Sequence, residues 1–106
     1  MKAIENAKEL ENLLKQDNAI LLDFYADTCP PCRALMPLVE KLAGKYEGKI
    51  EFQKVDVHKF PELRTQYKIG SIPTLLFVKK SEIVEKTVGV IAESELTEKL
   101  NNLIEV

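Results

Sequence analysis

Residues 21–33, LLDFYADTCPPCR, contain both cysteines of the 106-residue chain and join two different apolar patterns. The run from 19 to 26 is apolar apart from Asp23, as expected of a strand that is covered on both faces. After the second cysteine, apolar residues recur with a helical period from 33 to 46. Proline is well tolerated in the first turn of a helix, so the two prolines between the cysteines mark a helix start. The stretch therefore predicts a strand, a short loop and a helix that begins at the cysteines.

The position of the two cysteines favours a reversible disulfide. Helical neighbours three residues apart have Cβ atoms about 5–6 Å apart, whereas a disulfide requires about 3.5–4.5 Å. Cys29 precedes the helix, where the backbone angles are free to bring its sulfur to Cys32. The partial positive charge of the helix N-terminus favours the reactive thiolate of Cys29. Because Pro30 and Pro31 have no N–H, the Cys32 N–H is the nearest donor to that sulfur, and we expect only moderate activation.

A zinc site is one alternative use of the cysteine pair. Structural zinc requires four ligands, and the chain offers two cysteines and the single His58. We expect His58 to be solvated, between a strand and a short helix. A metal site would need a dimer that shares both pairs, or carboxylates, so we expect none. A helix-end pair without any function is the other alternative.

Asp23 is the polar exception in the apolar strand, and two interpretations are open. In the first, Asp23 lies near the strand end with access to water. In the second, it is a buried carboxyl group beneath the dithiol, with a pKa raised by desolvation, that accepts a proton from Cys32. An unpaired buried charge costs several kcal/mol. Lys54 on the neighbouring strand is a candidate charge partner, and its alternative interpretation is a solvent-facing lysine.

The rest of the chain alternates between strand and helix patterns. Asn6 and Glu9 form a capping-box sequence before the first helix. We expect the other strands at 2–4, 49–57, 74–78 and 82–88, and the other helices at 7–14, 61–67 and 93–104. This alternation implies an α/β fold with a largely parallel sheet and helices on both faces. A terminal hairpin makes the sheet mixed. We expect four to five strands and four helices in a single domain, residues 1–106.

Composition excludes several classes of partner. The net charge is −2, with 15 basic and 17 acidic residues spread along the chain, so no nucleic acid or anionic membrane is indicated. No apolar run approaches the ~20 residues of a membrane span. Met1 leads directly into an amphipathic pattern, so we expect no secretory leader and a cytoplasmic location. Structural disulfides are uncommon there, and a Cys-x-x-Cys pair is usually catalytic or metal-binding.

Three separated motifs resemble the thioredoxin family, and the match extends over nearly the whole chain. Residues 21–33 are similar to the thioredoxin active-site strand and loop. KIGSIPTLLFVKK, residues 68–80, is similar to the second signature, and TVGV, residues 87–90, to the glycine segment that follows. Several motifs in the right order are far more specific than one Cys-x-x-Cys. The resemblance implies a thioredoxin fold.

The same resemblance implies roles for the residues of the first motif. Cys29 is then the attacking thiol and Cys32 the resolving one. Asp23 is the buried carboxylate that transfers a proton, and Lys54 is its neighbour. Pro37 is the proline that kinks the active-site helix.

The second and third motifs imply a groove for substrate. An X–Pro bond taken by itself is expected to be trans, because cis occurs in only ~5–6% of cases. The resemblance implies instead that Ile72–Pro73 is cis, lies beside the dithiol and exposes the Ile72 backbone to an extended substrate segment. Gly89 keeps the opposite wall of the groove low. An apolar rim is expected from Pro31, Ile72, Val90 and Ile91.

Three departures from the family pattern surround the cysteines. Thr28 and Pro30 stand where thioredoxins usually carry Trp and Gly, and Tyr25 stands where a second Trp is common. The chain has no tryptophan. These changes reduce the apolar docking surface and stiffen the loop, and they leave partner choice and redox potential open.

The resemblance implies a protein-disulfide reductase that cycles between dithiol and disulfide. No cofactor is needed, because the electrons reside in the two sulfurs. The expected partners are disulfide-containing proteins and an electron donor similar to thioredoxin reductase, and we expect a monomer. One alternative is a glutathione-coupled reductase similar to glutaredoxin. Another is a non-enzymatic thioredoxin-fold module that uses the dithiol as a switch or a metal clip.

Overall fold

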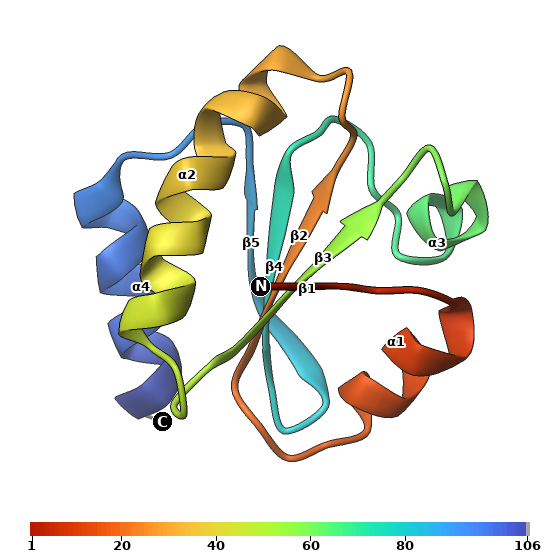
Figure 1. The fold of residues 1–106 in the computed structure, drawn as a ribbon. Coiled ribbons are helices and arrows are strands. Elements are labelled where there is room, and N and C mark those ends of the chain that lie inside the picture. Colours follow the sequence, from red (N-terminus) through yellow and green to blue (C-terminus); the bar gives the residue numbers. More distant parts are fainter. Residues whose placement is uncertain (106) are drawn as a thin grey trace.

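Five strands form the central sheet in the computed structural model, which describes residues 1–105. Their order across the sheet is β1-β3-β2-β4-β5 (Figure 1). The strands are β1 (Lys2–Ala3), β2 (Ile20–Tyr25), β3 (Glu51–Asp56), β4 (Thr74–Lys79) and β5 (Glu82–Val88). The helices are α1 (Ala7–Leu14), α2 (Pro30–Lys45), α3 (Pro61–Gln66) and α4 (Glu93–Glu105). The predicted order of elements is confirmed, and β2 lies at the centre of the sheet.

The sheet is mixed, as predicted, but its strand pairs divide evenly between the two orientations. β3 is parallel to β1 and β2, whereas β4 is antiparallel to β2 and β5. Relative to β2, strands β1, β3 and β5 run parallel, and β4 runs antiparallel because α3, which leads into β4, has only six residues. Such a helix spans about 9 Å, too little to return the chain along a strand of about 20 Å. β4 therefore begins at the edge where β3 ends, with Thr74 opposite Phe24.

Helices cover both faces of the sheet, with α2 and α4 on one side and α1 and α3 on the other (Figure 1). Successive residues of a strand point to opposite faces. Leu21 therefore packs in the core beneath α2 and α4. Leu22 packs in the separate core beneath α1 and α3. Asp23 lies on the same face as Leu21.

The longest helix in the described part of the chain is α2, with 16 residues. Two prolines occupy its first turn, as predicted, and Pro37 lies inside it without ending it. Leu35, Val39 and Leu42 recur at helical spacing and are fully buried against the sheet. Within residues 1–105, no helix combines the length and apolarity that crossing a membrane would require.

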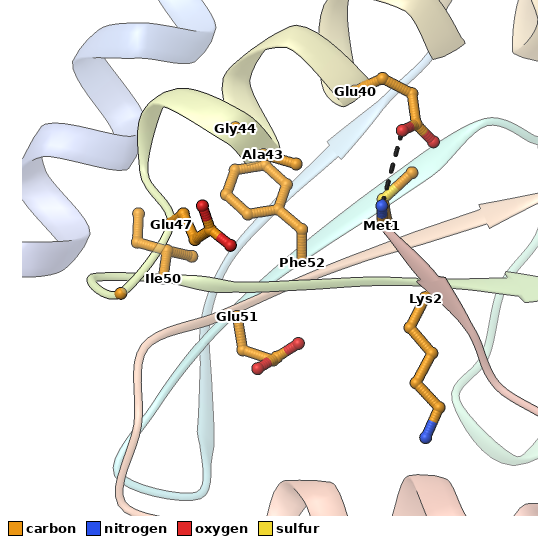
Figure 2. Close-up of a pocket in the computed structure, with 10 residues that line it drawn as sticks. Met1, Lys2, Glu40, Ala43, Gly44, Glu47, Ile50, Glu51 and Phe52 are labelled. Carbon is orange, nitrogen blue, oxygen red and sulfur yellow. Dashed lines mark ion pairs between the residues drawn. The ribbon is translucent and has the colours of Figure 1, made fainter.

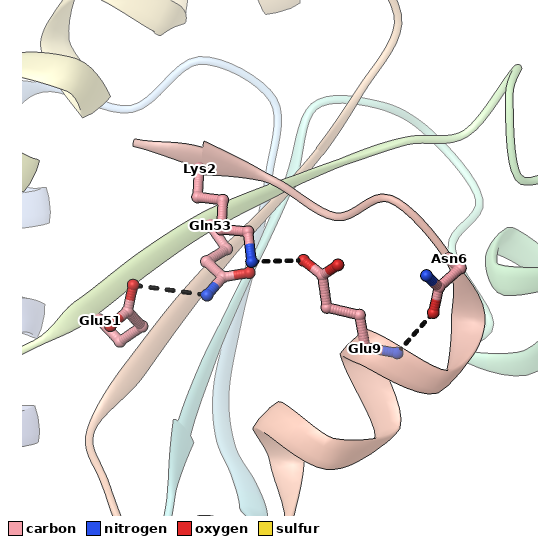
Figure 3. A network of polar contacts seen from close by, with 5 residues as sticks. All are labelled: Lys2, Asn6, Glu9, Glu51 and Gln53. Atoms are coloured by element: carbon pink, nitrogen blue, oxygen red, sulfur yellow. Dashed lines mark hydrogen bonds and ion pairs between the residues drawn. The ribbon is translucent and has the colours of Figure 1, made fainter.

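Only half of the predicted capping box forms at the start of α1. The Asn6 side chain accepts a hydrogen bond from the Glu9 N–H at 2.8 Å. The Glu9 carboxylate turns instead to Lys2, whose ammonium lies 3.0 Å away (Figure 3). Gln53 of β3 lies in the same network and donates to Glu51. The polar network thus joins α1 to β1, although a partly exposed ion pair contributes only about 0–1 kcal/mol.

Candidate active site

The two cysteines form a disulfide at the start of α2. Cys29 is the N-cap residue with an extended backbone, and Cys32 lies within the first turn. The two Cα atoms are 5.2 Å apart, within the range of disulfides. The reversible disulfide predicted from the spacing is therefore geometrically sound.

The two sulfurs differ in accessibility and in hydrogen bonding. Cys32 is only 1% exposed, whereas Cys29 is partly exposed. The Cys32 N–H donates to the Cys29 sulfur over 3.2 Å, so the predicted donor is confirmed. The two residues between them are prolines, which have no N–H to donate. One backbone donor and the helix dipole thus favour negative charge on Cys29.

The loop before β4 lies directly beside Cys29. The Ile72–Pro73 peptide bond is cis, as the family resemblance implied. The Ile72 carbonyl oxygen is 3.8 Å from the Cys29 sulfur. The Gly89 N–H donates to the Pro73 carbonyl over 2.8 Å, which joins the loop to the end of β5. Three segments distant in sequence therefore meet around one sulfur.

Gly89 has a φ of +89°, in the region that favours glycine. A Cβ built there would meet no atom within 4 Å, so the backbone conformation, and not crowding, requires glycine. Beside it, Val90 is 62% exposed and Ile72 is partly exposed. Pro31 is exposed as well.

Ile91 does not belong to this apolar surface, contrary to expectation. It is 8% exposed and packs in the core beneath α2 and α4. The chain turns inward after Val90 to begin α4, so successive side chains point to solvent and to the core. The apolar surface beside the dithiol is correspondingly smaller than predicted.

Asp23 is buried in the middle of β2, with 1% of its surface exposed. Neither carboxylate oxygen has a hydrogen-bond partner within residues 1–105. Burial is the main cause that raises the pKa of Asp23 to about 7. The positive charge of Lys54 acts in the opposite direction, and the charge of Glu40 adds to the increase. The interpretation with water access was wrong, because β3 and β4 flank Asp23 while α2 covers its face.

Lys54 lies opposite Asp23 in the register of β2 and β3. The two side chains nevertheless form no ion pair in the described part of the chain. The Lys54 ammonium lies over the Tyr25 ring instead, 5.4 Å from the ring centroid. Burial is the main cause of a raised pKa of Tyr25, and the carboxylates of Asp56, Asp27 and Asp23 add to it. The sequence predicted Lys54 as a neighbour of Asp23 but missed its contact with Tyr25.

A small pocket of about 100 Å³ lies next to Cys32. Its lining includes Tyr25, Asp27, Cys32, Arg33, Met36 and Lys54. Polar and charged groups therefore reach the neighbourhood of Cys32 from β2, β3 and α2. The pocket offers a short path between solvent and the buried side of the dithiol.

A wider hollow of about 420 Å³ contains neither cysteine. It lies between the C-terminal half of α2 and the start of β3, and Figure 2 shows its acidic lining. The Glu40 carboxylate there lies 3.6 Å from the Met1 amino group. Glu47 and Glu51 line the same hollow.

The structure places His58 at the surface, away from any cluster of ligands. It is exposed, and its backbone N–H donates to the Asp56 carboxylate over 2.9 Å. Across residues 1–105, no three His, Cys, Asp or Glu side chains are grouped so that they could hold a metal ion.

Comparison with known proteins agrees with this geometry. The family model described as Thioredoxin matches residues 2–102. Thioredoxin from Chlorobaculum thiosulfatiphilum is 39% identical over 92 residues, which cover 87% of this chain and 85% of that protein. The chloroplastic M-type thioredoxin of Spinacia oleracea is 34% identical over 112 residues, which cover 97% of this chain and 62% of that protein. A solved Plasmodium falciparum thioredoxin aligns with a TM-score of 0.88 and 27% identity, covering 96% of this chain and 98% of that one.

The fold and the cysteine pair both match this family. The expected thioredoxin fold, a mixed sheet with four helices, is confirmed. Thioredoxins are thiol–disulfide oxidoreductases, so the protein is a thioredoxin-like disulfide reductase with disulfide substrates and a reductase partner. Its relatives include bacterial and chloroplastic proteins. By sequence, fold and cysteine pair, the chain belongs to the thioredoxin family.

Proposed function

We propose that Cys29 attacks the disulfide of a substrate protein and that Cys32 resolves the mixed disulfide that results. The difference in exposure between the two sulfurs carries this proposal. A substrate sulfur can approach the partly exposed Cys29, whereas Cys32 is 1% exposed. The Cys32 N–H, 3.2 Å from the Cys29 sulfur, also stabilises the thiolate that attacks.

The reaction has two exchange steps. The Cys29 thiolate bonds to one substrate sulfur, the substrate disulfide breaks, and the departing thiolate takes a proton from water. Cys32 then loses its proton and attacks the Cys29 sulfur, which releases the second substrate thiol. Two electrons pass from the dithiol to the substrate, and Cys29–Cys32 becomes a disulfide. An external reductant restores the dithiol.

Asp23 is the proposed base for the second step. A carboxyl group with a pKa near 7 can accept a proton from Cys32 and later return it to water. Lys54, opposite Asp23 in the sheet, favours the charged form of that carboxyl group. Asp23 itself does not line the pocket of about 100 Å³, so the proton is proposed to reach solvent through groups that do, Cys32 and Lys54.

The substrate segment is proposed to lie along the loop before β4. The Ile72 backbone would pair with an extended chain, in the manner of strand addition. Pro73 holds that loop beside Cys29, and Gly89 leaves room on the opposite side. Pro31 and Val90 supply exposed apolar contacts.

The electron donor can be identified by one assay of turnover on a protein disulfide. The protein is supplied in turn with dithiothreitol, with NADPH plus thioredoxin reductase, and with glutathione. We expect turnover with the first two. Turnover with glutathione in place of the reductase would assign a glutaredoxin-like cycle, and failure with all three would favour a binding module.

We further propose that the protein works as a single-domain monomer in the cytoplasm. A reducing compartment would return Cys29 and Cys32 to the dithiol after each turnover. Light scattering should give a molar mass near the chain mass of 12.0 kDa. A dimer mass, or cell fractionation that places the protein in an organelle, would contradict this assignment.

A further inference from the structure

The ammonium group of Lys54 does not pair with the buried carboxyl group beside it. Lys54 and Asp23 are opposite each other in the sheet, and both Asp23 oxygens lack a partner within residues 1–105. A direct ion pair would satisfy both groups. The Lys54 chain instead extends towards the end of β2, where its ammonium lies 5.4 Å from the Tyr25 ring centroid. This distance lies inside the ~6 Å limit of cation–π attraction.

The surroundings of Tyr25 explain why the Lys54 ammonium lies over its ring and not beside Asp23. Tyr25 is two residues beyond Asp23 on the same face of β2, and it is partly exposed at the pocket beside Cys32. An ammonium group held there remains in contact with water. At Asp23 it would lose that water, because Asp23 is buried beneath α2. In a buried ion pair, the attraction between the charges often does little more than offset the free energy needed to remove water from them.

We propose that Tyr25 is a positioning residue whose ring holds the Lys54 ammonium at the pocket beside Cys32 and keeps it out of an ion pair with Asp23. This inference rests on the proposed role of Asp23 in the second exchange step. Tyr25 acts through the position of Lys54 and takes no part in the bonds that form or break at the two sulfurs.

Few charged groups face Asp23 from the elements packed around it, so one ammonium has a large influence. The surrounding groups are Lys54 from β3, Glu40 from α2, and the uncharged Leu75 and Thr87 from β4 and β5. An opposite charge within ~4–6 Å lowers a carboxyl pKa by about 1–3 units. An Asp23 paired with Lys54 would therefore stay ionised at neutral pH and would be a weaker base. With the ammonium at Tyr25, Asp23 can bind and release a proton near pH 7.

The test measures the titration midpoint of the Asp23 carboxyl carbon by NMR in the oxidised protein. Tyr25→Leu removes the ring and should lower that midpoint by about one pH unit. Tyr25→Phe retains the ring face and should leave it unchanged. Tyr25→Met is a second variant without a ring and should behave as Tyr25→Leu does. The pH at which the resolving step reaches half its maximal rate should move by the same amount.

Measurements in a Lys54→Met background distinguish an effect of the Lys54 charge from a change in how much water reaches Asp23. In Lys54→Met, where no ammonium is present, Tyr25→Leu should no longer lower the Asp23 midpoint. An equal decrease in that background would show that Tyr25 only excludes water, and the proposal would be wrong. An unchanged midpoint in Tyr25→Leu, or an equal decrease in Tyr25→Phe, would also overturn it.

The effect of Tyr25 on the position of Lys54 can be tested separately from the role of Asp23 as a base. Asp23→Asn should slow the resolving step about 10²-fold and leave the first attack unchanged. If Asp23→Asn changed neither rate, the role of Asp23 would fail. The titration in the Tyr25 variants would still show whether the ring positions Lys54.

Discussion

Leu22 and Asp23 are consecutive residues of β2 that point to opposite faces of the sheet. Both are almost completely buried, at 0% and 1% exposure. Leu22 packs among apolar side chains beneath α1 and α3. Asp23 lies beneath α2, where its two carboxylate oxygens find no partner within residues 1–105. Equal burial therefore has opposite consequences for stability on the two faces.

The two faces of the sheet contribute differently to the stability of the protein. Burying a leucine side chain contributes about 1.5–3 kcal/mol. Raising the pKa of Asp23 from 3.8 to about 7 costs about 4 kcal/mol when the carboxyl is ionised. The unfavourable residue lies on the face covered by α2, the helix that carries Cys29 and Cys32. The face beneath α1 and α3, which lacks the dithiol, is packed as an ordinary apolar core.

The largest expected effect is the loss of turnover when one of the two cysteines is replaced. Cys29→Ser should abolish turnover of a protein disulfide, because no attacking thiolate remains. Cys32→Ser should still attack and should accumulate a covalent complex with substrate, visible by non-reducing electrophoresis and mass spectrometry. Accumulation in Cys29→Ser, with none in Cys32→Ser, would reverse the assigned roles.

The next effect is a pH-dependent difference in stability between the wild-type protein and Asp23→Asn. Because the folded pKa of Asp23 is raised, its unfavourable contribution is absent below the unfolded value of 3.8 and complete above about pH 7. Asp23→Asn should therefore be more stable by about 4 kcal/mol at pH 8, and the difference should vanish near pH 4. Urea unfolding of both oxidised proteins across this pH range is the measurement. A constant difference would mean that ionisation of Asp23 is not responsible.

Shortening the Leu22 side chain on the opposite face should lower stability, whereas Asp23→Asn should raise it. Leu22→Ala leaves a cavity beneath α1 and α3 and should lower the free energy of unfolding by about 3 kcal/mol at every pH. Turnover per folded molecule should remain close to wild type, since the dithiol lies elsewhere. If Leu22→Ala altered the pH at which the resolving step reaches half its maximal rate, the two faces of the sheet would not act independently.

The smallest expected effect concerns the exposed apolar surface beside the dithiol. Val90→Ser should raise the KM for a protein substrate a few-fold, since Val90 is 62% exposed and one side chain supplies little contact area. Val84→Ser, at the similarly exposed Val84, is the matched control and should leave KM unchanged. An equal increase in both variants would show that general surface polarity, and not docking at Val90, sets the affinity.

Sequence reasoning was most successful where the outcome depends on neighbouring residues. Two prolines at the start of a helical period are enough to place Cys29 before the helix and Cys32 inside its first turn. The same local pattern identified the Cys32 N–H as the donor to Cys29, 3.2 Å from its sulfur. The cis Ile72–Pro73 bond followed only from the family resemblance, because the residues themselves favour trans.

Sequence reasoning was least successful where distant elements meet. Ile91 resembled its neighbour Val90 in the sequence, yet the start of α4 directs it into the core. The short α3 was predicted correctly, but the sequence patterns did not predict that it leaves β4 antiparallel to β2. Asp23 was left between two interpretations, since the sequence does not say which helix covers the middle of β2.

Two features follow from the sequence alone: the alternation of strands and helices, and the position of the dithiol at a helix start. These depend on residue periodicity and on the backbone limits of proline, which act over a few residues. The folded structure was needed to establish that Asp23 has no hydrogen-bond partner among residues 1–105 and that Lys54 turns to Tyr25. Both outcomes depend on which groups can keep their water once β3, β4 and α2 surround Asp23, and that is settled only when the chain is folded.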